Sequence, residues 1–351
     1  MHSRSETFEA TRIAIARVTE KTTMLKRIAG ILTIAAAISL VCTFPAHAQI
    51  KMPAETRNAA LRYWMAFAQM QDVPVDKPTA DLLAKTVAGD APWNEAKFGQ
   101  LIDNNAEAIE TMQRATKLPD CDWGLEYSRG PQTPITFVRN SALAMGRLNT
   151  LYGMRQAAKG DAANAAETWM AGIRFSRHLA QGQSLLATLI AATGLKANLH
   201  ALTQTAQTGM LSNAGKNRVA SFVRVLPETG FDWGQAMWYE EVPIDIMVAD
   251  LEKAPDAKGH YQELMGEPWP QNFTVPSDVE LAAYHKLMAK VEDALRQPPD
   301  KAQDQLKALE DSLHALHPFF QRTTPSLLKI NEARKQVQTL RDQLLAALEA
   351  K

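Results

Sequence analysis

Apolar residues recur along most of the chain at intervals of three and four, the spacing that places them on one face of an α-helix. The first such stretch, residues 57–71, carries Trp64 and Phe67 on one side. The last, residues 327–348, alternates steps of three and four, as in an antiparallel helix pair. No stretch alternates apolar and polar residues as a half-buried strand does. The pattern predicts an all-α fold, an irregular array of many helices.

Between these two stretches, the same spacing predicts further helices, and two Pro- and Gly-containing segments interrupt them. The interruptions are residues 118–134 and 253–276, which we expect to be long loops. The other predicted helices cover residues 79–87, 94–117, 135–152, 161–181, 184–202, 213–225, 235–252, 279–295 and 301–317.

The chain is organised around residues 153–202. Gly160 followed by Asp161 predicts a tight turn and a capped helix start, because Gly allows the reversal and the carboxylate accepts from free N–H groups. After a break at Gly182, the helix that begins near Ser184 is apolar on nearly every side. Such a helix is typical of the centre of a larger helical body.

Small and large residues alternate across the predicted turn in a way that is close to the tetratricopeptide pattern. They are Gly153, Gly160, Ala165, Trp169 and Gly172. We find no second copy at a spacing near the repeat length, and the usual closing Pro is absent. The pattern therefore indicates one tetratricopeptide-like central hairpin and does not establish a solenoid.

The N-terminal region predicts export. A short basic start at Met24, an apolar run over residues 28–41 and a small-x-small site at Ala48 follow the layout of a signal peptide, residues 24–48. We interpret residues 1–23 as a non-native upstream extension. This leaves open whether Met1 or Met24 is the true start, and whether the segment instead stays as a membrane anchor. Residues 49–351 are then a single helical domain in the periplasm or outside the cell, with residues 253–276 as an alternative internal boundary.

Charge and cysteine content limit the function of the exported chain. Removing residues 1–48 takes six basic and three acidic side chains from 38 of each, which leaves a net charge of about −3. No long basic stretch remains, so nucleic-acid binding lacks its usual electrostatic support, and we expect membrane contact only through an uncleaved signal segment. Only Cys121 remains, which excludes an intrachain disulfide.

Asp-Trp-Gly occurs twice, at residues 122–124 and 232–234. In one interpretation, Asp122 and Asp232 accept from backbone N–H groups of a turn while Trp123 and Trp233 pack the loop onto helices. In the other, these four residues form the rim of a ligand cleft. We favour the packing interpretation and keep the four residues as binding candidates.

The order of several motifs resembles that of a protein family. Cys121-Asp-Trp-Gly is followed by Gly130-Pro, by Ala157-x-x-Gly-Asp and by Arg174-Phe-Ser-Arg-His-Leu-Ala before a Leu-rich helix. This order is similar to that of uncharacterised exported all-helical proteins of planctomycete- and acidobacteria-type bacteria, over roughly residues 58–202. The resemblance implies export and a helical fold; because that family has no assigned activity, it implies nothing about catalysis.

Glu240 and Glu241, beside Trp238 and Tyr239, are the best carboxylate candidates. Adjacent helical residues point about 100° apart, so the two cannot form a tight acid/base pair, although one can occupy a pocket with a raised pKa. A half-buried Glu on an amphipathic helix is the commoner case.

Metal and cofactor chemistry has weak support. Glu310, His314 and His317 stand at metal-ligand spacing, but they share their helix face with polar residues, and we interpret that face as solvated. No nucleotide-binding or hydrolase motif occurs, and we therefore expect neither metal nor cofactor.

Two functional hypotheses follow. The first is a non-enzymatic scaffold that binds a protein or peptide partner in the cell envelope along the hairpin centred on Trp169. The alternative is a hydrolase or small-ligand-binding protein with a loop-covered pocket, in which Glu240 or Glu241 acts as the acid/base.

Overall fold

The computed structural model describes residues 56–71, 76–126, 138–182, 184–271 and 273–350. The predicted signal peptide and upstream extension lie outside the described residues. Thr56–Lys351 form one compact unit. The described residues form helices and no strand, with one isolated bridge between Asn58 and Asp120. The all-α prediction is confirmed.

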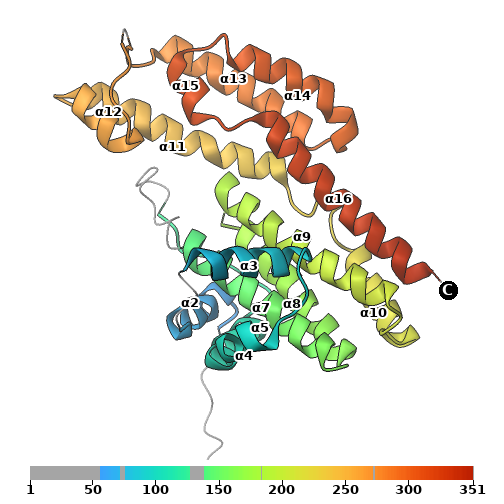
Figure 1. The fold of residues 1–351 in the computed structure, drawn as a ribbon. Helices are drawn as coiled ribbons and strands as arrows, with labels where there is room; N and C mark the ends of the chain where they lie inside the picture. Colours follow the sequence, from blue (N-terminus) through green and yellow to red (C-terminus); the bar gives the residue numbers. More distant parts are fainter. Residues whose placement is uncertain (1–55, 72–75, 127–137, 183, 272, 351) are drawn as a thin grey trace, which may run out of the picture. The chain divides into compact units, whose positions relative to one another are not determined.

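Figure 1 shows the helices, most of which are joined by short connections; the longest intervals between the described helices lie between α5 and η2 and between α12 and α13. In chain order they are α2 (Ala59–Gln69), α3 (Lys77–Ala88), α4 (Glu95–Asn104), α5 (Ala106–Ala115), a π-helical turn η2 (Val138–Ala142), α7 (Leu143–Ala158), α8 (Ala162–Ala180), α9 (Leu185–Gln207), α10 (Asn213–Arg224), α11 (Trp233–Lys253), α12 (Ala257–Met265), α13 (Asp278–Leu295), α14 (Pro299–Leu313), α15 (Pro318–Thr323) and α16 (Leu327–Glu349).

Helix α9 is the central helix of this array. It packs most extensively against α8 and α16, and it also contacts α7 and α11. Among the described residues it is the one helix long and apolar enough to cross a membrane, yet most of that stretch is buried against other helices. The prediction of a buried central helix is confirmed, and this burial accounts for its apolar sequence.

Helices α7 and α8 pack against each other as a helical hairpin with its turn at Gly160. Gly160 adopts a left-handed conformation, φ 82°, and Asp161 caps α8 by accepting from the Asn164 N–H at 3.2 Å. Trp169 lies 2% exposed beneath α7, where its Nε1 donates to the Thr150 carbonyl at 3.2 Å. Gly153 makes room for this indole, because a Cβ there would lie 2.4 Å from Trp169 Nε1.

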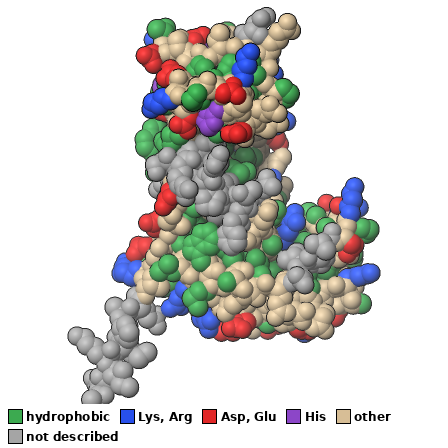
Figure 2. All heavy atoms as spheres, turned by 90° about the vertical axis from the view of Figure 1, so that its left-hand side faces the viewer, with side chains coloured by type: hydrophobic (Ala, Val, Ile, Leu, Met, Phe, Trp, Pro, Cys, Tyr) green, Lys and Arg blue, Asp and Glu red, His purple; other side chains and the backbone are tan. Residues whose placement is uncertain are grey.

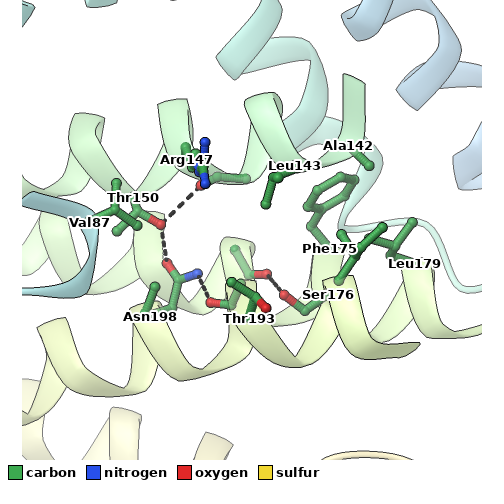
Figure 3. A pocket seen from close by; sticks show the side chains of 15 residues that line it. Val87, Ala142, Leu143, Arg147, Thr150, Phe175, Ser176, Leu179, Thr193 and Asn198 are labelled. Carbon is green, nitrogen blue, oxygen red and sulfur yellow. Dashed lines mark hydrogen bonds between the residues drawn. The ribbon is translucent and has the colours of Figure 1, made fainter. Parts of the chain in front are cut away.

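A small cavity of about 30 Å³ lies between α7, α8 and α9. Figure 3 shows Thr150, Ser176 and Asn198 around it, and each of these side chains bonds a carbonyl of its own helix at 2.7–3.0 Å. Gly172 lets α8 approach, since a Cβ there would lie 2.6 Å from Asn198 Oδ1. Small residues thus set the spacing of the three helices. The buried polar side chains of Thr150, Ser176 and Asn198 find hydrogen-bond partners in the backbone of their own helices.

The helical spacing gives wrong boundaries at three places. The helix predicted over residues 94–117 is broken at Asn105, whose buried side chain donates to the Leu101 carbonyl and accepts from the Gln71 N–H. The loop predicted over residues 253–276 contains α12, which Asp256 caps. The helix predicted to reach His317 ends at Leu313, because Pro318 starts a new helix.

The fit of Trp169 against Gly153 generates a stability prediction. Gly153→Ala will lower the free energy of unfolding by about 1–3 kcal/mol, because the added methyl group overlaps a buried indole, which must shift to accommodate it. Urea denaturation followed by circular dichroism measures the change.

The matched control is Gly146→Ala on the same helix. A Cβ at Gly146 would meet its nearest neighbour, Phe175, at 3.9 Å, which is an ordinary contact. Ala is the better helix former, so this variant will be unchanged or up to about 1 kcal/mol more stable. Equal effects of the two substitutions would show that the contact between Gly153 and Trp169 is not tight.

Candidate functional site

The first Asp-Trp-Gly segment packs a loop onto α2 and α8. Asp122 accepts from the Gly124 N–H at 2.9 Å, and Trp123, 4% exposed, donates from Nε1 to the His178 carbonyl at 2.8 Å. The Trp123 ring stacks on Tyr63 with centroids 5.3 Å apart. Burial and the neighbouring Asp122 raise the pKa of Cys121 to about 12, so its thiol stays protonated.

The second segment forms the start of a helix. Asp232 is the N-cap of α11 and accepts from the Gln235 N–H at 2.9 Å. Trp233 is 1% exposed and donates from Nε1 to the Thr229 carbonyl at 3.0 Å. Both tryptophans are therefore packing residues. Asp232 borders two surface pockets, and Trp233 lines one of them as well.

Glu240 reaches from α11 to the N-terminus of α9. Its carboxylate accepts from the Leu185 N–H at 2.7 Å, which places a negative charge at the positive end of that helix. Burial raises the pKa of Glu240, and the N–H groups of Leu185 and Leu186 oppose this shift without cancelling it. The residue joins two helices.

Glu241 belongs to a different cluster. His285 of α13 lies between two carboxylates of α11: its Nδ1 faces Glu241, and its Nε2 bonds Asp245 at 2.8 Å. Burial alone would lower the pKa of His285, but the two carboxylates outweigh it, so the net shift is upward. Burial, together with Glu241, raises the pKa of Glu292 to about 7.

This cluster was missed in the sequence because His285 lies 44 residues after Glu241. One signal was present, since Glu241 and Asp245 stand four residues apart on one helix face. Both imidazole nitrogens are occupied by carboxylates, and no group of His, Cys, Asp and Glu in the described ranges is placed to hold a metal ion. The cluster fastens α11 to α13.

A groove of about 600 Å³ lies above the hairpin. The C-terminal ends of α7 and α9 and the segment between α3 and α4 form its walls, and Trp169 contributes to its floor. Its lining is mostly apolar or small. The lining residues are Gly89, Asp90, Ala91, Pro92, Trp93, Met154, Ala157, Ala158, Trp169, Ala201, Gln204, Thr205, Thr208 and Met210.

The geometry of this groove depends on Gly89, which ends α3 in a left-handed conformation with φ 87°. A Cβ at Gly89 would lie 2.3 Å from His200 Nε2, so only glycine lets the segment pass this close to α9. Met210, 46% exposed, and the half-buried Trp93 and Met154 lie along the groove. Sequence reasoning located Trp169 and missed these three residues.

The structure does not bring the six predicted site residues together. Asp122 and Trp123 lie against α2 and α8, Asp232 and Trp233 start α11, and Glu240 and Glu241 contact different helices. On the face drawn in Figure 2, acidic and basic side chains are interspersed.

The chain matches no family model, no curated protein and no solved structure. The resemblance to exported helical proteins therefore stays a prediction, and function must be argued from the geometry alone.

The His285 cluster generates a pH prediction. Because the folded-state pKa of His285 is raised, its contribution to stability is complete below the unfolded value of 6.5 and is lost as the pH rises through the higher, folded value. Glu292 acts in the same direction, since its folded pKa of about 7 exceeds the unfolded 4.5. We expect Glu292 to lower the melting temperature between pH 4.5 and 7, and His285 to lower it further as the pH rises above 6.5, with a loss of at most about 1 kcal/mol from the solvent-screened His285 pair.

Differential scanning fluorimetry at constant ionic strength measures this slope. The buried His178, whose pKa burial lowers to about 4, acts in the opposite direction between that value and its unfolded value of 6.5, so the effect of His285 is measured above pH 7. His285→Asn will flatten the slope there, whereas His314→Asn, at the exposed end of α14, will leave it unchanged. An unchanged slope in His285→Asn would refute the role given to this residue.

Proposed function

We propose that this chain is a non-enzymatic, exported helical scaffold that binds a peptide segment of a protein partner in the cell envelope. The observation that carries the proposal is the 600 Å³ groove over Trp169, whose volume lies within the range of ligand sites in proteins.

The lining of the groove favours a particular kind of segment. Asp90 is the only ionisable side chain among the lining residues of the groove. A segment with several charges would therefore lose hydration at most of them without gaining an oppositely charged partner. Met154 and Met210 are flexible and adapt to the shape of a bound side chain, and Trp93 offers a rigid aromatic surface. The groove therefore favours a peptide that carries apolar side chains.

Polar side chains along one wall supply hydrogen bonds. Gln204 and Thr208 are exposed on the last turns of α9 and line the groove. The Gln204 amide can both donate and accept, whereas the Thr208 hydroxyl, which donates to the Thr205 carbonyl at 3.1 Å, can accept; the two together suit the C=O and N–H groups of a peptide backbone. This combination of apolar pockets and backbone bonding is a common mode of peptide recognition.

The tetratricopeptide-like nature of the hairpin and the export of the chain are parts of the same proposal. Gly153 facing Trp169 across α7 and α8 supports the first, because the tetratricopeptide pattern places small residues opposite large ones. The signal-peptide layout of residues 24–48 supports the second. If that segment is retained as a membrane anchor, the helical domain that carries the groove would be tethered to the membrane.

The alternative, a hydrolase that uses Glu240 or Glu241, has less support. Glu240 is bonded to the N-terminus of α9, and Glu241 is bonded to His285. An acid/base residue must reach a substrate proton, and both carboxylates are engaged in contacts between helices. These contacts favour the binding scaffold.

The proposal predicts that blocking the groove will abolish peptide binding. Peptides selected from a displayed random library on residues 49–351 will be rich in apolar residues. Ala158→Trp will weaken their binding at least tenfold, because the exposed Ala158 lines the groove and an indole there occupies it. Fluorescence anisotropy with a labelled peptide measures the dissociation constant.

Ala163→Trp is the matched control. Ala163 is equally exposed, on the first turn of α8, and does not line the groove. This variant will bind as the parent does. Failure to select any peptide, or equal binding by Ala158→Trp, would refute the proposal.

A further inference from the structure

A pocket of about 290 Å³ lies at the second Asp-Trp-Gly segment and shares no lining residue with the groove. The connection between α10 and α11 forms one wall, the turn between α13 and α14 forms another, and Arg334 of α16 closes it. Its lining residues are Pro227, Glu228, Thr229, Phe231, Asp232, Trp233, Leu295, Arg296, Gln297, Pro298 and Arg334.

Arg334 is buried, with 1% of its surface exposed. Its Nη1 donates to Asn331 Oδ1 at 2.7 Å, and its Nη2 donates to the Gln297 carbonyl, but its Nε has no acceptor among the described residues. No described carboxylate lies within ion-pair distance of it. A buried guanidinium without a counter-charge is costly, because it has lost its hydration.

The neighbouring groups compensate this charge only in part. The Gln297 carbonyl follows the C-terminus of α13, the negative end of that helix, and a cation there is favourable. Carbonyl dipoles are weaker partners than a carboxylate. Burial lowers the pKa of Arg334 to about 10, with no acidic neighbour acting against it, so the side chain is still charged at neutral pH.

We propose that this pocket binds a small organic carboxylate, whose oxygens supply the counter-charge to Arg334. The guanidinium presents N–H groups in a planar fork that matches a carboxylate. Arg296, half-exposed at the same pocket, adds a second positive group, and Phe231 and Pro298 provide apolar surface for the body of the ligand.

A singly charged ligand suits the site better than phosphate does. Glu228 and Asp232 line the same pocket, and each carboxylate repels an anion. Arg296 is also shared with Glu292 and Asp293, at 3.4 Å from each. Attraction to the two arginines and repulsion by the two carboxylates both double for a dianion, so they largely offset one another. The hydration that the ligand loses on entering the pocket grows with the square of its charge, so a dianion is penalised more strongly than a monoanion.

The test is a thermal-shift titration of residues 49–351 with sodium benzoate at constant ionic strength, with sodium chloride as the reference. We expect a saturable rise in melting temperature with half-saturation in the millimolar range. Arg334→Met will raise the half-saturating concentration at least tenfold. Glu228→Gln will lower it, because it removes a repelling charge.

Two further arms keep the test decisive. Arg341→Met is the matched control on α16, since Arg341 is also largely buried but does not line the pocket, and it will bind benzoate as the parent does. If Arg334→Met does not fold, Arg296→Met must weaken binding several-fold. No saturable shift with benzoate, a shift with phosphate alone, or unchanged binding in the variant used would overturn the proposal.

Discussion

The packing of α9 against α8 on one side and α16 on another is the constraint on which the rest of the structure depends. It joins the helices that precede it to those that follow it. Close approach is possible because Gly172 and Gly194 face polar side chains that then bond to the backbone. Cys121 is free, and no disulfide lies within the described residues, so the buried apolar surface of α9 must supply much of their stability.

Two charged side chains join helices by bonding to the backbone at the end of a neighbouring helix. Glu240 carries a negative charge to the N-terminus of α9, and Arg334 carries a positive charge to the C-terminus of α13. Both arrangements follow the helix dipole. Glu240 bonds to the first N–H of α9, whereas Arg334 retains an N–H without a hydrogen-bond partner among the described residues, at a pocket. Glu240 therefore serves to join two helices, whereas the unpartnered N–H of Arg334 is the basis for the proposed ligand site.

The groove and the pocket have opposite chemistry. The groove, which is lined by one ionisable side chain, selects by shape and apolar contact, and it depends on the left-handed Gly89 beside α9. In the proposal for the pocket, charge selects the ligand, because Arg334 and Arg296 line it together with apolar side chains and the carboxylates of Glu228 and Asp232. The two sites share no lining residue, so the proposed peptide binding and the proposed carboxylate binding can be tested independently of each other. Neither site uses the His285 cluster, which fastens α11 to α13.

The sequence by itself determined the helical class, the turn at Gly160 and the burial of α9 and both Asp-Trp-Gly tryptophans, because each depends on local spacing or local turn chemistry. It predicted one continuous helix over residues 94–117 and missed the break at Asn105, since that side chain bonds to the distant Gln71. It also could not show that Glu240 and Glu241, adjacent in the chain, reach α9 and α13 respectively. The groove beside Trp93 and the pocket at Arg334 were decided by tertiary structure alone, because their walls come from segments far apart in the chain, and burial removes hydration only once those segments meet.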